Sequence, residues 1–251
     1  MALKNDESIV SDLLPQLPKD ASRIVEFGLC PTDIFKFYSE ANPAVDYYAV
    51  NHLLRKKAIA LKPRKGGVTD IIGNAESLSL KEMGVARKSV DCIILLNVLE
   101  NMIDPWSFMN HQVEYLSENG MIIAVFQNFG HWSTIYNLIV GKWFFKDNYV
   151  SSKERIRFFS AATISELFEM SGLRITKYFR RILKDNKYQS FFSAFSNAFQ
   201  QLNVDLTRFE EQATTLKYIV QAKKDSKNLG KEMNSSCQKD HRDMKNAILD
   251  Q

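Results

Sequence analysis

Short apolar runs separated by amphipathic segments fill the first half of the chain. Five of these runs are bounded by polar or turn residues and are predicted to be strands: 23–28, 45–51, 67–73, 89–99 and 121–128. The fourth contains the uninterrupted apolar run 92–96, which is typical of a strand that is covered on both faces. The pattern therefore predicts a sheet that is buried on both sides.

The segments before and between these strands have apolar residues at helical spacing, which predicts helices over 7–17, 33–41, 52–60 and 104–120. The last of these has the clearest end signals, with Asp104 as N-cap, Pro105 at the first helical position and Gly120 at the end. Alternating strands and helices predict an α/β fold with a doubly wound parallel sheet and helices on both faces.

The second half of the chain changes character. Residues 129–159 are rich in aromatic residues and only partly periodic, so we expect an inserted cap or acceptor-binding region. Further elements are predicted as a helix over 160–172 capped by Ser160, a strand over 173–181, a helix over 189–202 and a strand over 214–224. These segments complete a predicted domain of residues 1–224, and the polar segment 225–251 is predicted to be a mobile tail.

Composition narrows the class of protein. The 251 residues are 45% hydrophobic and 25% charged, which suits one large globular domain or two small ones. The formal charge of +4 is far from the concentrated basic surface of a nucleic-acid-binding protein, so we expect no nucleic-acid partner. The chain begins without a secretion-signal pattern, and no apolar run reaches the ~18 residues of a membrane span. We therefore expect a cytoplasmic protein.

The cysteines and histidines predict no metal site. Cys30, Cys92 and Cys237 are odd in number and far apart in sequence, which indicates reduced thiols. The four histidines are scattered along the chain. The sequence also lacks the signatures of serine hydrolases, zinc proteases and P-loop nucleotide-binding proteins.

Ligands of a parallel, doubly wound sheet bind at the carboxyl ends of its strands. The residues that follow the predicted strands are 28–32, 51, 73–76, 97–101 and 127–132. These positions carry several asparagines and a histidine, so a binding site is expected at this edge of the sheet.

Several sequence segments at and after the predicted strands are characteristic. They are RIVEFG, YYAVN and GNAESL at the first three strands, SVDCIILLNVLENMIDPWSFM at the fourth, and then ENGMIIAVFQNFGHWS and RIRFFSAATISELFEMSGLRI. Together they resemble the class I S-adenosylmethionine (SAM)-dependent methyltransferases, in particular the branch associated with bacterial cell-surface polysaccharide gene clusters. The resemblance covers roughly residues 9–224. It implies a Rossmann-like fold with a seven-stranded, mostly parallel sheet whose last strand runs antiparallel.

The resemblance also implies a SAM site, but its first loop is altered. The family pattern there is acid-x-Gly-x-Gly-x-Gly, whereas this chain keeps Glu26 and Gly28 and continues with Leu29, Cys30 and Pro31. Side chains in place of glycines narrow the space through which the backbone approaches the ligand. Glu26, Gly28 and Leu29 are the candidate cofactor residues of this loop. Glu26 lies within an apolar strand, where a carboxylate requires a partner.

Asparagines stand at the other cofactor positions that the resemblance implies. Asn51 replaces an acid that receives the ribose hydroxyls, and it keeps an acceptor oxygen without the charge that strengthens such bonds. Asn74 replaces an aspartate that faces the adenine amino group, and the backbone of Ala75 is the candidate partner of the ring. Asn97, after the fourth strand, completes the candidate set. For Asn51 and Asn74 a role as turn residues stays open.

The methyl acceptor is expected near the end of the fifth strand. His131 is the only histidine near this position, and its unperturbed pKa lies close to neutral pH, so it is the candidate general base. The candidate acceptor pocket consists of Asn101, Trp132, Tyr136, Arg155 and Arg157. The resemblance implies that Asn101 stands where the family frequently has a histidine. It also implies that Arg155 stands where relatives often have a histidine that serves catalysis. A packed loop around His131 and an exposed charged loop around the arginines stay open as alternatives.

The function expected from the resemblance is SAM-dependent O- or N-methylation of a sugar or other small acceptor, in cell-surface glycan biosynthesis. The competing hypothesis is a catalytically silent methyltransferase-like protein used for binding or scaffolding, because several polar positions have changed together. A third hypothesis is that the same site binds a different nucleotide.

Overall fold

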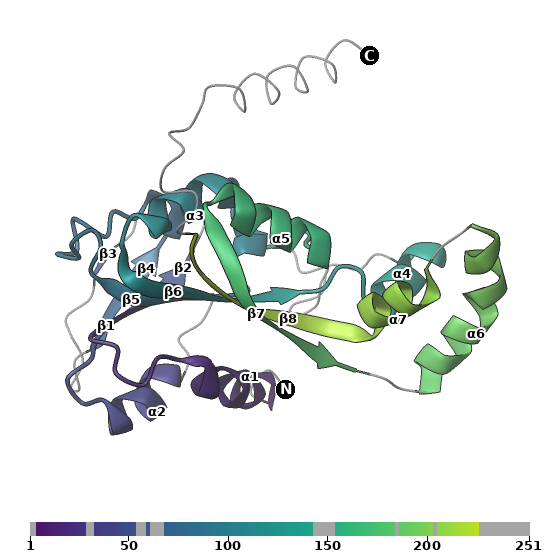
Figure 1. The fold of residues 1–251 in the computed structure, drawn as a ribbon, viewed down its shortest axis with the longest axis horizontal. Helices are drawn as coiled ribbons and strands as arrows, with labels where there is room; N and C mark the ends of the chain where they lie inside the picture. Colours follow the sequence, from purple (N-terminus) through teal and green to yellow (C-terminus); the bar gives the residue numbers. More distant parts are fainter. Residues whose placement is uncertain are drawn as a thin grey trace, which may run out of the picture.

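The computed structural model describes residues 4–28, 33–53, 59–60, 68–142, 154–183, 186–202 and 205–225. One sheet runs through this part of the chain, with the strand order β3-β4-β2-β1-β5-β6-β8-β7 (Figure 1). The strands are β1 Arg23–Gly28, β2 Asp46–His52, β3 Ile59–Ala60, β4 Val68–Gly73, β5 Val90–Leu96, β6 Leu116–Gln127, β7 Leu173–Ile182 and β8 Thr215–Lys224. The helices are α1 Lys4–Leu13, α2 Ile34–Ala41, α3 Pro105–Val113, α4 Trp132–Ile139, α5 Ala161–Met170, α6 Asn186–Gln201 and α7 Leu206–Thr214.

The directions of the strands confirm the predicted seven-stranded, mostly parallel sheet. Each neighbouring pair from β4 through β2, β1 and β5 to β6 is parallel. The last strand, β8, runs antiparallel between β6 and β7, as expected. The two-residue strand β3 pairs antiparallel with β4 and adds a short eighth strand at one edge.

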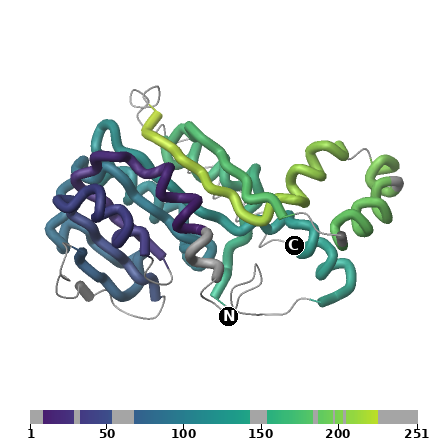
Figure 2. Tube along the Cα trace, turned by 90° about the horizontal axis from the view of Figure 1, so that it is seen from below, coloured from purple at the N-terminus to yellow at the C-terminus, as the bar shows by residue number. Residues whose placement is uncertain are grey.

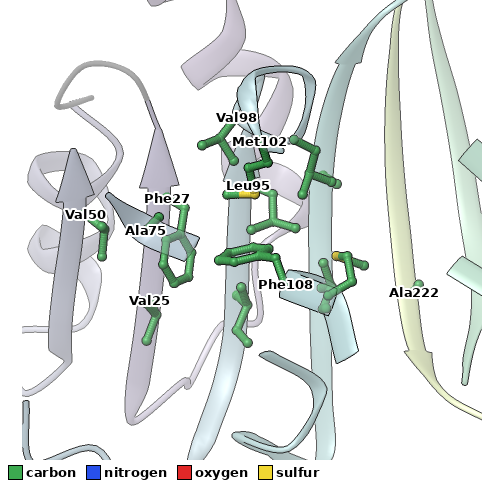
Figure 3. Packing of buried hydrophobic residues seen from close by; sticks show 14 of the residues in the cluster. Val25, Phe27, Val50, Ala75, Leu95, Val98, Met102, Phe108 and Ala222 are labelled. Carbon is green, nitrogen blue, oxygen red and sulfur yellow. The ribbon is translucent and has the colours of Figure 1, made fainter. Parts of the chain in front are cut away.

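Helices cover both faces of the sheet. On one face α1 and α2 bury apolar residues that include Leu13, Ile34 and Tyr38 against the strands. On the other face α3 and α5 cover a larger core (Figures 1 and 3). There the ring of Phe108 from α3 meets Phe27 of β1 edge to face, with ring centroids 5.1 Å apart. Packing of this kind on both faces explains why the central strands read as apolar runs.

Two helix predictions are wrong at the described residues. The segment 52–60 was expected to be helical, but His52 ends β2 and Ile59–Ala60 forms β3. The helix that begins after Asp104 ends at Val113, and Gly120 lies inside β6. A Cβ atom on Gly120 would lie 2.8 Å from the carbonyl oxygen of Val90. The glycine at this position is therefore explained by close contact between neighbouring strands.

Three helices form a separate layer, which we call the helical cap: α4, α6 and α7. Its core contains Trp132, Tyr188, Phe191 and Ala213. The helix α7 was missed by the sequence analysis, although the side chain of Asp205 caps it by accepting the N–H of Arg208 at 3.1 Å. Figures 1 and 2 show the three helices gathered at one end of the molecule.

The strands determine where the helical cap lies. The helices α4 and α6 follow the carboxyl ends of β6 and β7, and α7 precedes β8. Because β8 is antiparallel to its neighbours, its first residue lies at the same edge of the sheet as their carboxyl ends. The helical cap is thus attached at the edge where ligands of such sheets bind. Residues 226–251 lie outside the described residues, so the tail stays a prediction. The inserted region predicted over 129–159 is a different segment from the helical cap and is described only at 129–142 and 154–159, so its role in acceptor binding also stays a prediction.

Candidate functional site

The register of the central strands brings three predicted site residues together. Gly28, the last residue of β1, pairs with Asn51 of β2 on one side and with Leu96 of β5 on the other. Asn97 directly follows Leu96. The carboxyl ends of three neighbouring parallel strands therefore present Gly28, Asn51 and Asn97 side by side, as the sequence predicted.

Asn97 has an unusual backbone conformation. Its φ angle is +48°, in the left-handed region that few residues other than glycine adopt. The side-chain oxygen Oδ1 is buried and has no hydrogen-bond partner among the described residues. Asparagine tolerates this region better than most residues, so the informative feature is the unused buried acceptor, which is typical of a ligand-binding position.

The ends of β2 and β4 are joined by His52. The Nδ1 atom of this buried ring accepts the backbone N–H of Ala75 at 3.0 Å. Burial lowers the pKa of His52, although Glu76, the backbone of Asn101 and Glu154 act in the opposite direction. The ring is therefore held in its neutral form, with Nδ1 as hydrogen-bond acceptor.

Asn74 and Ala75 lie at the start of the 3₁₀ turn Ala75–Ser77, directly after β4. The side chain of Asn74 caps this turn by accepting the N–H of Glu76 at 3.0 Å. This contact is the turn role that asparagine often takes. The Ala75 amide, which was the predicted partner of the adenine ring, donates to His52. Both groups have partners within the chain.

Glu100 lies in the 3₁₀ turn after β5 and connects three segments. Its Oε1 accepts the N–H of Gln127, at the end of β6, at 2.9 Å. The same atom lies 3.4 Å from Nη1 of Arg155, and the side chains of Glu100 and Arg155 are 1% and 6% exposed. Burial raises the pKa of Glu100, and Arg155 partly offsets this effect. The backbone carbonyl of Glu100 also accepts the N–H groups of Ile156 and Arg157.

The second predicted arginine and Asn101 lie beside this ion pair in the chain. Arg157 donates to the backbone carbonyl of Ile103, and its guanidinium lies 5.6 Å from the ring centre of Trp106. Asn101 is 1% exposed, and its Oδ1 has no hydrogen-bond partner among the described residues. Both arginines thus contact groups of this chain, and their role in an acceptor pocket stays a prediction.

Unused hydrogen-bond acceptors gather at this edge of the sheet. Among the buried side-chain oxygens without a hydrogen-bond partner within the described ranges, five lie at this edge, and we call them the strand-end oxygens: Asn51 Oδ1, Glu76 Oε2, Asn97 Oδ1, Glu100 Oε2 and Asn101 Oδ1. Buried polar atoms are rarely left unpaired in native proteins. All five lie at or just after the carboxyl ends of β2, β4 and β5. They match a ligand that presents several hydrogen-bond donors.

Glu26 has a partner within the strands. It is 3% exposed, and the hydroxyl of Tyr47 in β2 donates to its Oε2. Burial and the adjacent carboxylate raise the pKa of Tyr47 well above its ordinary value, which keeps the phenol protonated. This contact accounts for a carboxylate inside an apolar strand. Leu29, the third candidate of the first loop, lies outside the described residues.

The candidates after β6 belong to the helical cap. His131 is 2% exposed and is the N-cap of α4, with its Nδ1 atom 2.8 Å from the hydroxyl of Ser133. Trp132 packs against Phe191 of α6, with ring centroids 6.0 Å apart. Tyr136 is 46% exposed. Within the described chain the strand-end oxygens accept no hydrogen bond from these residues, and the catalytic and acceptor roles of His131, Trp132 and Tyr136 stay predictions.

The sequence suggested only a helix start for His52, and no binding or catalytic role was predicted for His52, Glu76 or Glu100. A histidine and two carboxylates at strand ends were available signals, because buried ionisable groups at such positions are frequently functional. Among the described residues, no group of three or more His, Cys, Asp or Glu is arranged to hold a metal ion. No helix within the described ranges is long and apolar enough to cross a membrane.

Comparison with known proteins shows similarity in fold rather than sequence. No protein-family model matches the sequence, and no curated protein matches it. A SAM-dependent methyltransferase from Archaeoglobus fulgidus aligns with a TM-score of 0.57 at 11% identity, over 87% of this chain and 94% of that chain. The fold is that of class I methyltransferases.

Two further structures show how varied the proteins with this class I methyltransferase fold are. The 1,6-didemethyltoxoflavin-N1-methyltransferase of Burkholderia thailandensis, solved with S-adenosylhomocysteine, has a TM-score of 0.52 at 11% identity, over 89% of this chain and 82% of that chain. The cyclase SpnF has a TM-score of 0.51 at 10% identity, over 89% of this chain and 83% of that chain. Because a cyclase shares the fold, the reaction has to be argued from the site.

Proposed function

We propose that this protein is a SAM-dependent methyltransferase that acts on a sugar or another small acceptor in the cytoplasm. The observation that carries the proposal is the cluster of strand-end oxygens. They are buried, they lie where ligands of this fold bind, and each is a hydrogen-bond acceptor without a partner among the described residues. SAM offers matching donors in its adenine amino group, its two ribose hydroxyls and its α-ammonium group.

The residues at the strand ends fit this cofactor in part. Asn51 and Asn97 flank Gly28 in the sheet, and their Oδ1 atoms are suited to accept from hydroxyl or amino groups. The Ala75 amide is already bonded to His52, so the adenine contact that the resemblance implies would require that bond to be exchanged. We therefore assign cofactor binding chiefly to Gly28, Asn51 and Asn97.

When bound, SAM supplies a methyl group that its sulfonium already activates. The protein then has to align the methyl acceptor and remove a proton. We assign alignment to Asn101, which follows Glu100 in the turn after β5, and to Arg155 and Arg157 in the segment that Glu100 holds. We keep His131 as the candidate base, although its Nδ1 atom is engaged with Ser133. The proposed place of the enzyme in surface-glycan biosynthesis rests on the sequence resemblance alone.

Titration calorimetry with SAM and with S-adenosylhomocysteine tests the proposal directly. We expect saturable binding of both ligands and an increase in melting temperature, because a ligand that binds only the native state stabilises it. ATP and NAD at the same concentrations are the controls. Absence of heat and of a thermal shift at millimolar SAM would rule out the proposal.

The second candidate function is a silent methyltransferase fold used for binding. It is favoured by the internal contacts at Asn74 and Ala75, which occupy two groups that the family uses for the adenine ring. A methyl-transfer assay with labelled SAM and a panel of sugars separates the two functions once binding has been measured. Tight SAM binding with no transfer to any acceptor would favour this second function.

A further inference from the structure

The strand β7 lies at an edge of the described sheet. It is the last strand in the strand order and pairs only with β8 (Figure 1). The outward N–H and C=O groups of an edge strand have no strand partner, so they are available to pair with another chain. Proteins commonly limit such pairing by keeping edge strands short, but β7 is ten residues long.

The side chains in the second half of β7 are exposed on both faces of the sheet. Leu173, at the start of the strand, belongs to the core, whereas every residue from 176 to 180 is exposed. Tyr178 and Phe179 are 37% and 36% exposed, and Ile182 is 52% exposed. Because neighbouring residues of a strand point to opposite faces, Tyr178 and Phe179 leave apolar surface on each face. Such a strand favours pairing with a partner that covers this surface.

Two irregularities limit the length of β7 that a partner strand can follow. The register between β7 and β8 shifts between Ile175 and Lys177 and again between Arg181 and Ile182. Between these points, residues 177–181 pair in continuous register with β8. Irregularities of this kind interrupt the pairing along an edge. The regular stretch 177–181, which we call the β7 edge, therefore accommodates a partner strand of about five residues.

The charge of β7 indicates the chemistry of the partner. All charged side chains of this strand are basic: Arg174, Lys177, Arg180 and Arg181. Arg180 pairs with Glu211, and Arg181 pairs with Asp12. None of the ion pairs found among the described residues includes Lys177. The adjacent strand β8 has three lysines and no acidic residue. This excess of positive charge favours an acidic partner.

A second copy of the chain does not match this edge. Pairing of two β7 strands would bring the basic side chains of both copies together without an acidic one, and like charges across a strand pair are destabilising. We propose that the β7 edge binds an acidic, extended segment of another protein as an additional antiparallel strand. Main-chain hydrogen bonds supply the pairing, a carboxylate complements Lys177, and apolar side chains cover Tyr178 and Phe179.

The capped peptide Thr-Glu-Glu-Val-Val-Glu-Thr is the probe. In antiparallel register it places its valines opposite Tyr178 and Phe179 and a glutamate opposite Lys177. Binding is followed by two-dimensional NMR of the full chain, and we expect saturable shifts of the amide signals of residues 177–181. A lysine-for-glutamate peptide, and a peptide with N-methyl groups on both valines, should each bind at least about fivefold more weakly.

Each control peptide can overturn one part of the proposal. Equal affinity for the lysine peptide would contradict the acidic partner, and equal affinity for the N-methylated peptide would contradict strand pairing. Absence of any shift at residues 177–181 with the probe peptide would overturn the proposal as a whole. Tighter binding of a short single-stranded RNA at the same signals would assign the surface to nucleic acid instead. A dimer of the protein alone that protects these amides from hydrogen exchange would assign it to a second copy.

Charge reversal on the protein gives a matched pair of variants. Lys177→Glu places a negative charge at the centre of the proposed contact and should weaken binding of the probe peptide by at least about threefold. Lys81→Glu makes the same change at an exposed position outside β7 and should leave the affinity unchanged. A thermal melt confirms that both variants are folded. Equal affinities of the two variants for the probe peptide would rule out the assignment to the β7 edge.

The same variants separate this proposal from the proposed methyltransferase function. In the sheet, β6 and β8 lie between β7 and the strands that carry the strand-end oxygens. SAM titration of Lys177→Glu should therefore give the affinity of the parent protein. Loss of peptide binding with unchanged SAM binding supports two separate sites. Peptide binding in a protein that binds no SAM would contradict the proposed function alone, and SAM binding without peptide binding would contradict only the β7 edge.

Discussion

Glu100 and Arg155 form an ion pair in the interior, with 3.4 Å between Oε1 and Nη1. The pair links the turn after β5 to the segment that precedes α5. Glu100 strengthens this link because its backbone carbonyl accepts the N–H groups of Ile156 and Arg157, both at 2.9 Å. Glu100 thus holds the segment with the predicted acceptor-pocket arginines at the strand-end site through both its side chain and its backbone carbonyl.

Removing one partner of this pair should destabilise the fold. Arg155→Met leaves the buried Glu100 carboxylate without its charge partner, and we expect a loss of about 3 kcal/mol in the free energy of unfolding, measured with urea. The double variant Glu100→Gln, Arg155→Met should lose less than the two single variants added together. Arg87→Met is the matched control, because the Arg87–Glu114 pair is exposed and should contribute less than about 1 kcal/mol. Equal losses in Arg155→Met and Arg87→Met would contradict this interpretation.

Glu100 should also make stability depend on pH. Burial raises the pKa of Glu100 in the folded state, so the folded protein favours the protonated carboxyl. This contribution to the free energy of unfolding is fully present below the unfolded-state pKa and is lost as the pH rises through the folded-state pKa. Glu100→Gln removes this loss. The stability of the variant relative to the wild type should therefore increase as the pH rises from about 4 to about 7. Urea unfolding at several pH values measures this difference, and a constant difference would show that Glu100 does not titrate differently in the folded state.

Asn97 combines a backbone role with a proposed ligand contact, and two variants separate the roles. Asn97→Gly relieves the left-handed conformation, so we expect its stability to stay within about 1 kcal/mol of the parent. Asn97→Leu should cost about 1–2 kcal/mol because a larger side chain is strained at positive φ. Both variants lose Oδ1 and should bind SAM about tenfold more weakly. SAM affinity that survives in Asn97→Gly would restrict Asn97 to the backbone role.

His52 should give the opposite pH dependence. Burial lowers its pKa below the ordinary 6.5, so the stability that comes from the neutral ring is present above the unfolded-state pKa and is lost as the pH falls. His52→Asn keeps a hydrogen-bond acceptor for the Ala75 amide but does not titrate. Between about pH 7.5 and about pH 5.5 the wild type should lose more stability than this variant. Parallel losses in the two proteins would show that His52 keeps its ordinary pKa.

Local signals in the sequence predicted much of the fold. The caps at Asp104 and Ser160 are present, with side chains that accept the N–H groups of Ser107 and Thr163. Gly172 has a φ of +68°, as expected of a glycine that ends a helix. These signals succeed because capping depends on neighbours in the chain. The prediction that Gly120 ends a helix is wrong because this glycine is explained by contact with Val90, thirty residues away, which no local pattern reveals.

For the candidate site, the sequence predicted only which residues lie together at the strand ends, because the order of the strands determines those positions. The parallel register places Gly28, Asn51 and Asn97 together, and the alternation of elements was sufficient to find them. The partners of Glu100 lie 27 and 55 residues away, at Gln127 and Arg155. Such pairs depend on how loops from distant segments meet, and periodicity contains no information on that. The bond between His52 and Ala75 was missed for the same reason.

Asn51 offers the most direct test of how the strand ends bind a ligand. Its Oδ1 is buried without a partner among the described residues, so Asn51→Leu should weaken SAM binding by about tenfold. Asn51→Asp introduces the carboxylate that the resemblance implies at this position and should tighten binding, because charged acceptors form stronger bonds with hydroxyl donors. Asn110→Leu, at an exposed position of α3, is the control and should leave affinity unchanged. Calorimetry measures all three affinities. If Asn51→Leu binds SAM as tightly as Asn110→Leu, the ribose contact assigned to Asn51 is wrong.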